Sequence, residues 1–470
     1  MNFHCADMKH SNEWLNSGVA AMKRIIVNFA VWTTVMLAVL ALGACLLTGC
    51  SVQPAASTIT APAASVVLSG HVHGGQQPVS GASIQLWAAG SGGYGSASTA
   101  LLTPAVLSDA NGNFNITDGY TCPSASTQVY ITATGGNPGL TAGTDNTALA
   151  MMTALGSCGN LQSTTFISVN ELTTVASVWS LSHYMSSSSA IGASATNATG
   201  LASAFASVNK VVNTTTGSLP GTALPANATL PTAEIDTLAD ILAGCINSVG
   251  GVAGDSSPCG NLLSAATPAG SSAPADTIEA AIDIARNPGT NVAAIFALAS
   301  ANAPFQPALT SSPTDWMIGI NYVGGGLSAP VAMAVDSTGN IWFANGGANS
   351  ISELSSTGAA VSSAAGYTGG GLNVPSAIAI DLTGNVWVAN SAGNSVSKFT
   401  SAGVPVVTTA FTGGGLNTPK SLSIDGYDDV WLANSGNNSV TELNSSGQAL
   451  SGGYGGGGIS SPTGIAINPQ

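Results

Sequence analysis

The stretch DLTGNVWVAN, residues 381–390, decides the fold of the last third of this chain. Two near-copies, DSTGNIWFAN and DGYDDVWLAN, occupy residues 336–345 and 425–434. The leading Asp and the polar residues after it form a hairpin turn, and the residues that follow alternate as on a β-strand. The motif is therefore a local folding unit that occurs three times.

The spacing of these copies indicates the architecture. Their tryptophans, Trp342, Trp387 and Trp431, lie 45 and 44 residues apart, and the segment GGGL recurs with a similar period. A period of about 40–50 residues, with several short strands in each unit, is typical of β-propeller blades. One blade cannot bury its own faces, so the repeats must stack. We expect the tryptophan to fill the space between neighbouring blades.

The repeats resemble NHL-repeat propellers and the wider group that contains virginiamycin B lyase and gluconolactonase-like enzymes. The resemblance covers residues 316–470. It implies the fold but no single activity, because the group includes lyases, lactonases and binding scaffolds. Virginiamycin B lyase uses a histidine base, and no histidine follows His183 in this chain. Lactonases of the group collect acids at a central channel, whereas the repeated acids here lie in turns, at Asp336, Asp381 and Asp425.

The number of repeats departs from a complete propeller. Three full repeats and the opening of a fourth are present, whereas propellers typically have 4–8 blades. Three explanations stay open: the chain is truncated, the ring closes by oligomerisation, or the blades form an open arc. We expect truncation, because Gln470 falls in the middle of a repeat.

One polar residue recurs in register and is a candidate for binding. Asn345, Asn390 and Asn434 stand at the end of the Trp-containing strand in each repeat. They either line one mouth of a central channel, where they would contact a ligand, or cap the loop backbone at the strand ends. The second alternative is favoured, because capping is the more common use of Asn at such positions.

The N-terminus has the features of an export signal. Positively charged residues precede an apolar run that ends in LTGC at Cys50, which is the plan of a secretory signal. LTGC resembles the bacterial lipoprotein lipobox, in which the cysteine becomes the first mature residue and carries the lipid. LGAC, ending at Cys45, is a weaker candidate, and a single transmembrane anchor is the alternative. We predict a signal over residues 1–50 and a tether over 51–64. Because Ser51 rather than Asp follows the cysteine, the resemblance implies an outer-membrane location.

Residues 65–139 are predicted to form a small β-domain. Apolar and polar residues alternate between Gly and Pro turns, and the order SGxVxGG, PVSGAxIxLW, DxNGNFxI, YxxC resembles the transthyretin-like carboxypeptidase regulatory domain. That resemblance implies a β-sandwich without catalysis of its own. His71 and His73 share one strand face, because side chains repeat every second residue. Two imidazoles can bind a metal, but no third ligand is near in the sequence, and we predict no metal site.

Residues 144–302 are predicted to form a small helical bundle. Apolar residues recur at helical spacing in several segments. Ser168 and Glu171 are predicted to form a capping box at the first helix, and Asp276 and Glu279 to cap a later one. Asp236 and Asp240 lie four residues apart. Such a pair can hold a cation, but we expect ordinary exposed helix acids.

Four cysteines remain beyond the signal, at Cys122, Cys158, Cys245 and Cys259, and they allow three pairings. Cys245–Cys259 is local and is the pairing we expect. Cys122–Cys158 would then tie the first domain to the second. The alternative, four buried free thiols, is uncommon outside the cytosol.

Charge excludes one class of partner. The net charge is −14, and Lys and Arg number seven in all, so no basic surface is available to hold phosphates and nucleic acid is not an expected partner.

Taken together, the segments predict that the whole chain is multidomain and mainly β: a β-sandwich, a helical middle domain and an incomplete β-propeller. We expect an exported, lipid-anchored surface protein whose propeller is a non-catalytic binding scaffold for a protein, glycan or small molecule, without a cofactor. The alternatives are a lyase or hydrolase of the virginiamycin B lyase group, and a structural envelope protein.

Overall fold

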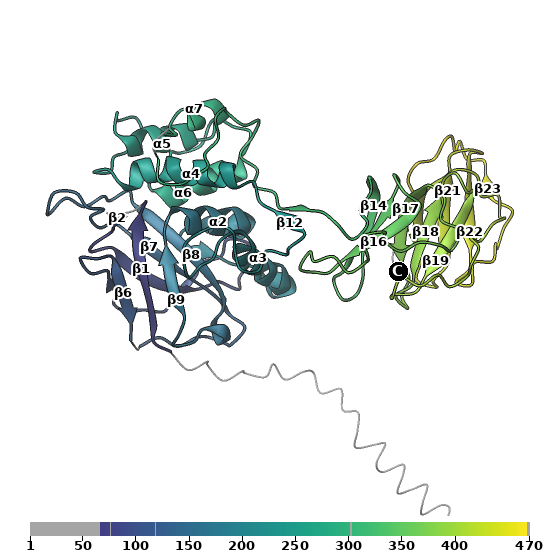
Figure 1. The fold of residues 1–470 in the computed structure, drawn as a ribbon, viewed down its shortest axis with the longest axis horizontal. Coiled ribbons are helices and arrows are strands. Elements are labelled where there is room, and N and C mark those ends of the chain that lie inside the picture. Colours follow the sequence, from purple (N-terminus) through teal and green to yellow (C-terminus); the bar gives the residue numbers. More distant parts are fainter. Residues whose placement is uncertain (1–65, 76, 118, 301–302, 468–470) are drawn as a thin grey trace, which may run out of the picture. The chain divides into compact units, whose positions relative to one another are not determined.

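The computed structural model describes residues 66–75, 77–117, 119–300 and 303–467. The predicted signal and tether, with Cys50, lie outside the described residues. The described chain is mainly β, with sheets and helices up to residue 300 and a series of small antiparallel sheets after residue 329 (Figure 1). None of the helices in these ranges is both long enough and apolar enough to cross a membrane.

Two sheets form the N-terminal part of the fold. The first contains β1 (Leu68–Gly74), β2 (Gln77–Pro78), β6 (Asn113–Ile116) and β9 (Phe166–Val169), with β1 between antiparallel β6 and parallel β9. The second contains β3 (Ser83–Ala88), β4 (Thr99–Ala100), β5 (Val106–Leu107), β7 (Gln128–Thr134) and β8 (Ala150–Ser157), with β7 between β3 and β8. Buried and half-buried residues alternate along β1 and β3, because successive side chains point to opposite faces. β7 is buried on both faces.

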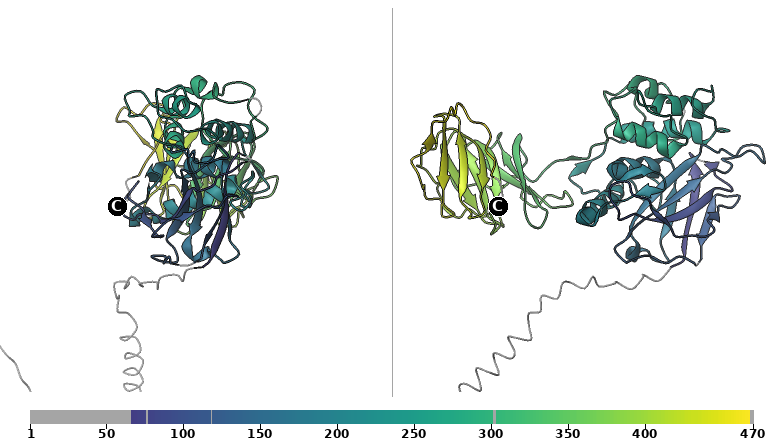
Figure 2. Two further views of the ribbon diagram at one scale, coloured as in Figure 1. Left: turned by 90° about the vertical axis from the view of Figure 1, so that its left-hand side faces the viewer. Right: turned by 180° about the vertical axis from the view of Figure 1, so that it is seen from behind.

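Six helices follow within the described residues. They are α2 (Glu171–Leu181), α3 (Ala198–Val211), α4 (Thr232–Ile246), α5 (Pro258–Ala266), α6 (Thr277–Arg286) and α7 (Val292–Phe296). Helices α2, α3 and α6 pack on β8 (Figure 2), which explains why most of this strand is apolar on both faces. Shorter elements are η1 (Cys158–Asn160), η2 (Ser182–Tyr184), η3 (Ala195–Asn197), the hairpin of β10 (Met185–Ser187) with β11 (Ala190–Ile191), and the pair β12 (Ala228–Thr229) with β13 (Asn321–Tyr322).

Two predicted domain boundaries are wrong. The segment 144–302 contributes β8 and β9 to the sheets, and one continuous core extends from Leu68 to Trp316, so the helices do not form a separate domain. Trp316 is fully buried in this core, and its carbonyl oxygen accepts a hydrogen bond from Trp179 Nε1 at 2.8 Å. The boundary predicted at residue 316 therefore cuts through the first core, and the blades begin after it.

Both expected cysteine pairs form disulfides in the structure. Cys122–Cys158 joins the segment after β6 to the end of β8. Cys245–Cys259 joins the last turn of α4 to the first turn of α5. Two disulfides in one chain are typical of an oxidising compartment, outside the cytosol.

Three blades follow. Blade 1 contains β14 (Pro330–Val335), β15 (Ile341–Asn345) and β16 (Ser350–Leu354). Blade 2 contains β17 (Pro375–Ile380), β18 (Val386–Asn390) and β19 (Ser395–Phe399). Blade 3 contains β20 (Pro419–Ile424), β21 (Val430–Asn434), β22 (Ser439–Leu443) and β23 (Tyr454–Gly455). The antiparallel register is the same in each, so the tryptophans pair with Glu353, Lys398 and Glu442 respectively. In the recurring GGGL segment, Gly326 has a φ of +76°, and a Cβ there would lie 2.1 Å from the backbone nitrogen of Gly366.

The blades bury each other's faces. Trp342 belongs to a core with Ile378 and Val388 of blade 2, and Trp387 belongs to the next core, with Leu432 of blade 3. Trp342 and Trp387 are fully buried, whereas Trp431, on the last complete blade, is half-buried. The outer face of blade 1 is also more exposed than the inner blades. Met333 of blade 1 is 68% exposed, while its equivalents Ile378 and Leu422 are 7% and 8% exposed. The tryptophan is thus an inter-blade residue, as the sequence predicts.

Candidate functional site

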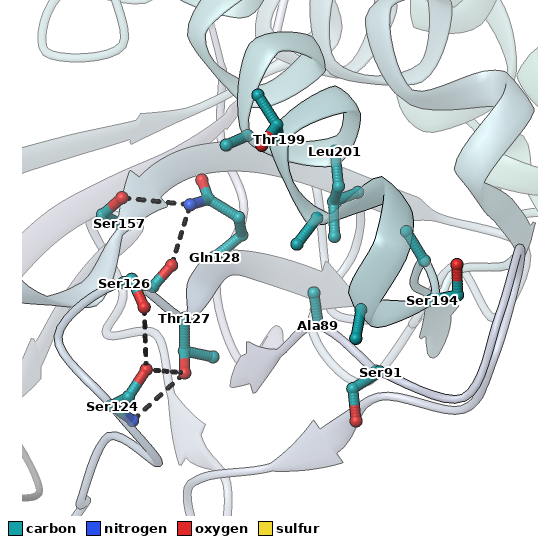
Figure 3. Close-up of a pocket in the computed structure, with 15 residues that line it drawn as sticks. Ala89, Ser91, Ser124, Ser126, Thr127, Gln128, Ser157, Ser194, Thr199 and Leu201 are labelled. Carbon is teal, nitrogen blue, oxygen red and sulfur yellow. Dashed lines mark hydrogen bonds between the residues drawn. The ribbon is translucent and has the colours of Figure 1, made fainter. Parts of the chain in front are cut away.

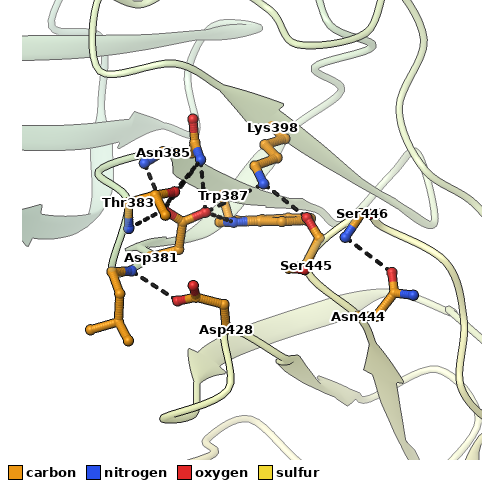
Figure 4. Close-up of polar contacts among 10 residues, drawn as sticks. Asp381, Thr383, Asn385, Trp387, Lys398, Asp428, Asn444, Ser445 and Ser446 are labelled. Atoms are coloured by element: carbon orange, nitrogen blue, oxygen red, sulfur yellow. Dashed lines mark hydrogen bonds and ion pairs between the residues drawn. The ribbon is translucent and has the colours of Figure 1, made fainter. Parts of the chain in front are cut away.

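The repeated aspartates organise the hairpin turns of the blades. In blade 2, Asp381 Oδ1 accepts hydrogen bonds from the backbone nitrogens of Thr383 and Asn385 at 3.1 and 2.8 Å. Its Oδ2 accepts one from Trp387 Nε1 at 2.9 Å (Figure 4). Lys398 lies 4.4 Å above the Trp387 ring centroid and 3.4 Å from Asp381 Oδ2. One carboxylate therefore closes the turn and also orients the inter-blade tryptophan.

These contacts also set the charge of the aspartates. Burial raises the pKa of Asp381, but hydrogen bonds from Thr383, Trp387 and Asn385 outweigh it and lower the pKa to about 2. The pKa values of Asp336 and Asp425 are also lowered, because the hydrogen bonds of their own turns outweigh burial. The three aspartates are therefore ionised at neutral pH. A general base works best with a pKa near the working pH, so their position and their charge suit a structural role.

The three candidate asparagines are buried inside the blades. Asn345, Asn390 and Asn434 are each 0% exposed. The Asn390 side chain accepts a hydrogen bond from the backbone nitrogen of Asn373 at 3.1 Å and donates to Ser397 Oγ at 2.9 Å. The other two make equivalent contacts. Their side chains thus hold the loop that leads into each blade, and they present no surface to a ligand at a channel mouth.

The tips of the same turns are the exposed and variable part of the repeat. Equivalent positions carry Ser337, Leu382 and Gly426, and the next position carries Thr338, Thr383 and Tyr427. Leu382 is 78% exposed and Tyr427 is 89% exposed. The turns of blades 2 and 3 lie side by side, because the backbone nitrogen of Leu382 donates to Asp428 Oδ1 at 2.9 Å. We call Leu382 and Tyr427 the tip pair.

A cavity of about 460 Å³ lies in the first region, between the start of β7 and the start of α3. Figure 3 shows Gln128, Ser157 and the segment 124–127 on one side, with Thr199 and Leu201 of α3 opposite. Gln128 Nε2 donates to Ser157 Oγ at 3.0 Å. The lining carries hydroxyl, amide and methyl groups and no charged side chain. Its size is in the range of small-molecule sites, and its chemistry suits a small uncharged polar ligand.

Several acids of the helical segment are buried, which the sequence did not reveal. The predicted capping box is wrong: the N-cap of α2 is Asn170, whose side chain accepts from the Thr173 backbone nitrogen, while Ser168 lies in β9. Glu171 is 0% exposed, and burial raises its pKa to about 8. Its Oε1 accepts from the Gly75 backbone nitrogen at 2.7 Å. Asp276 does cap α6, as predicted, by accepting from the Glu279 backbone nitrogen.

The expectation that Asp236 and Asp240 are exposed is also wrong. They are 5% and 3% exposed, and burial raises the pKa of each to about 6. Asp240 Oδ1 accepts from the Phe305 backbone nitrogen at 2.9 Å. In the ranges that the structure describes, no group of three or more His, Cys, Asp or Glu side chains is arranged to hold a metal ion. The raised pKa values of these acids make the stability of this core depend on pH.

Comparisons with known proteins give likenesses of low coverage. No family model matches the chain, and no curated protein matches it. Among solved structures, a streptogramin B lyase is 22% identical with a TM-score of 0.25, over 32% of this chain and 48% of that one. A virginiamycin B lyase from Staphylococcus aureus is 18% identical with a TM-score of 0.22, over 27% and 41%. A protein of unknown function from Bacteroides caccae is 16% identical with a TM-score of 0.23, over 30% and 50%. The chain thus spans half the length of these structures or less.

Proposed function

We propose that this chain is an exported, lipid-anchored binding protein whose blades carry a non-catalytic site for a neutral glycan. The observation that carries the proposal is the contrast within the repeat. The side chains of the recurring Asp, Trp and Asn residues form the hydrogen bonds of the turns and the contacts between blades. The residues that differ stand exposed at the turn tips, and two of them form the tip pair, Leu382 and Tyr427.

The chemistry of the tip pair suits a sugar ring. An aromatic face combined with an apolar side chain on the adjacent turn offers contact area at low cost in conformational entropy. Asp428, whose Oδ1 accepts from the Leu382 backbone nitrogen, lies beside the pair, and its carboxylate can accept hydrogen bonds from sugar hydroxyls. The low density of charge in the whole chain, with 6% charged residues, favours an uncharged ligand over an ionic one.

The enzyme alternative has less support in these residues. A lyase or hydrolase needs a group that moves a proton, and the repeated aspartates are held ionised by their turns. The sequence has no histidine after His183. A purely structural envelope role would leave the exposed Tyr427 without a use.

The test is binding of the full chain, in detergent micelles, to an array of neutral glycans, followed by calorimetry on the best one. We expect Tyr427→Ala to weaken binding at least tenfold and Leu382→Ala to weaken it less. Leu450→Ala is the matched control, because Leu450 is also exposed, at 52%, but belongs to the segment after β22 rather than to the aspartate turns. It should bind like the parent chain.

A further variant separates the blades from the cavity. Thr199→Trp fills the cavity beside α3 and should leave glycan binding unchanged. Loss of binding in Thr199→Trp, with normal binding in Tyr427→Ala, would move the site to the cavity and refute the tip pair. Absence of any glycan binding would refute the proposed ligand class.

A further inference from the structure

Two histidines lie together on the outer side of the first sheet. His71 and His73 are both half-buried residues of β1, and their ring centroids are 4.5 Å apart. The structure therefore places two imidazoles on one strand face, where their spacing in the sequence predicts them. Phe166 of the neighbouring strand β9 lies against His71, with ring centroids 5.2 Å apart.

A hydrogen bond from the adjacent strand orients one of the rings. Ser168 of β9 is paired in register with His71, and its Oγ lies 2.7 Å from His71 Nε2. Ser168 is 0% exposed and is held by its backbone hydrogen bond to the Thr214 carbonyl oxygen. When Nε2–H donates to this oxygen, Nδ1 carries the free lone pair. This is the usual second-shell arrangement of a metal-binding histidine, whose other ring nitrogen is hydrogen-bonded.

The surroundings keep both rings neutral. Burial lowers the pKa of His71, and the neighbouring His73 lowers it further. Burial also lowers the pKa of His73. No carboxylate contributes to either shift, so neither ring is held as an imidazolium. Neutral imidazoles offer lone pairs at neutral pH, whereas a protonated ring cannot coordinate a cation.

We propose that His71 and His73 form an open two-histidine site for a borderline divalent cation, Zn²⁺ or Cu²⁺, with Ser168 as a positioning residue for His71. The imidazole nitrogens of His71 and His73 are ligands that these cations prefer. The protein supplies two ligands, and water or a ligand from solution completes the coordination, because both side chains are partly exposed. The site is independent of the glycan proposal and lies on a different part of the chain.

The experiment is calorimetric titration of the full chain in detergent micelles with ZnCl₂ and, separately, with CuSO₄. His71→Ala and His73→Ala should each remove one bound equivalent. His183→Ala is the matched control and should retain it. His4 and His10 lie in the signal that the proposed processing at Cys50 removes, and they are identical in every variant, so they do not distinguish the variants. Far-UV circular dichroism checks that each variant keeps its strands.

Two further readouts test the geometry itself. Ser168→Ala keeps both imidazoles but removes the orienting oxygen, and we expect affinity to fall about 10–100-fold. Electron paramagnetic resonance of the Cu²⁺ form should show two equatorial imidazole nitrogens. An unchanged stoichiometry in the His71→Ala, His73→Ala double variant would overturn the site. An unchanged affinity in Ser168→Ala would overturn the role of Ser168.

Discussion

Replacing Trp387 by Ala should destabilise the blades strongly. The indole is 0% exposed and fills the core shared by blades 2 and 3. Truncating a buried Trp to Ala costs about 3–5 kcal/mol through lost burial and the cavity left behind. The change also removes the Nε1 donor to Asp381 Oδ2, while this oxygen keeps its contacts with Asn385 Nδ2 at 3.0 Å and Lys398 Nζ at 3.4 Å. Two neighbours of the ring, Lys398 and Phe411, lose their contact with it as well.

The same change at Trp431 provides the internal comparison. Trp431 makes the same hydrogen bond, to Asp425 Oδ2 at 2.9 Å, but it is half-buried. Because the stabilisation scales with the apolar area removed from water, Trp431→Ala should cost less than Trp387→Ala. Trp342→Ala should match Trp387→Ala, because both rings are fully buried.

Thermal unfolding of the full chain, followed by scanning calorimetry, measures the difference. A loss of 4 kcal/mol corresponds to a fall of roughly 10 °C in the midpoint of the blade transition. Tyr427→Ala is the control, since its side chain is 89% exposed and should leave the midpoint unchanged. Equal falls for Trp387→Ala and Trp431→Ala would refute the argument, because burial between blades would then not determine the cost.

Three other predictions follow from the first core and the N-terminus. Burial raises the pKa of Glu171 from 4.5 to about 8; the unfolded chain therefore releases this proton first, and stability falls as pH rises from about 4.5 to 8. Glu171→Gln should remove that slope, so its thermal midpoint should exceed that of the parent chain at pH 8 and approach it near pH 4. Peptide mapping without reduction should recover Cys245 linked to Cys259 and Cys122 linked to Cys158; free thiols in exported protein would contradict both pairs. Cys50→Ala should abolish metabolic labelling with palmitate in a bacterial host, whereas undiminished labelling would place the lipid on Cys45 or elsewhere.

Local sequence carried much of the blade architecture. The strands, the turns and the role of the tryptophan depend on residues within one period. Because the period is repeated, a prediction made from one copy can be checked against the others. The surroundings of the three asparagine side chains could not be predicted from the sequence. A strand-end Asn faces a channel or a loop according to where the preceding GGGL segment packs, and only the packed blade places the backbone nitrogen of Asn373 3.1 Å from Asn390 Oδ1.

In the first core, from Leu68 to Trp316, local sequence predicted less of the structure than it did in the blades. Helical periodicity predicted helices within residues 144–302, but β8 was not recognised, because a strand covered by helices on one face and by another layer on the other lacks alternation. Short α5 was missed as well; its signal was Ser257 as N-cap followed by Pro258.

The sequence alone indicated that the chain is mainly β and that its last third is built from stacked repeats, and it favoured the cysteine pairing that the structure shows. These features follow from local periodicity and from spacing along the chain. Only the tertiary structure decided that Glu171, Asp236 and Asp240 are buried and that Ser168 contacts His71. A polar side chain has the same local pattern whether a distant segment covers it or water does, so its burial and its pKa are properties of the assembled core.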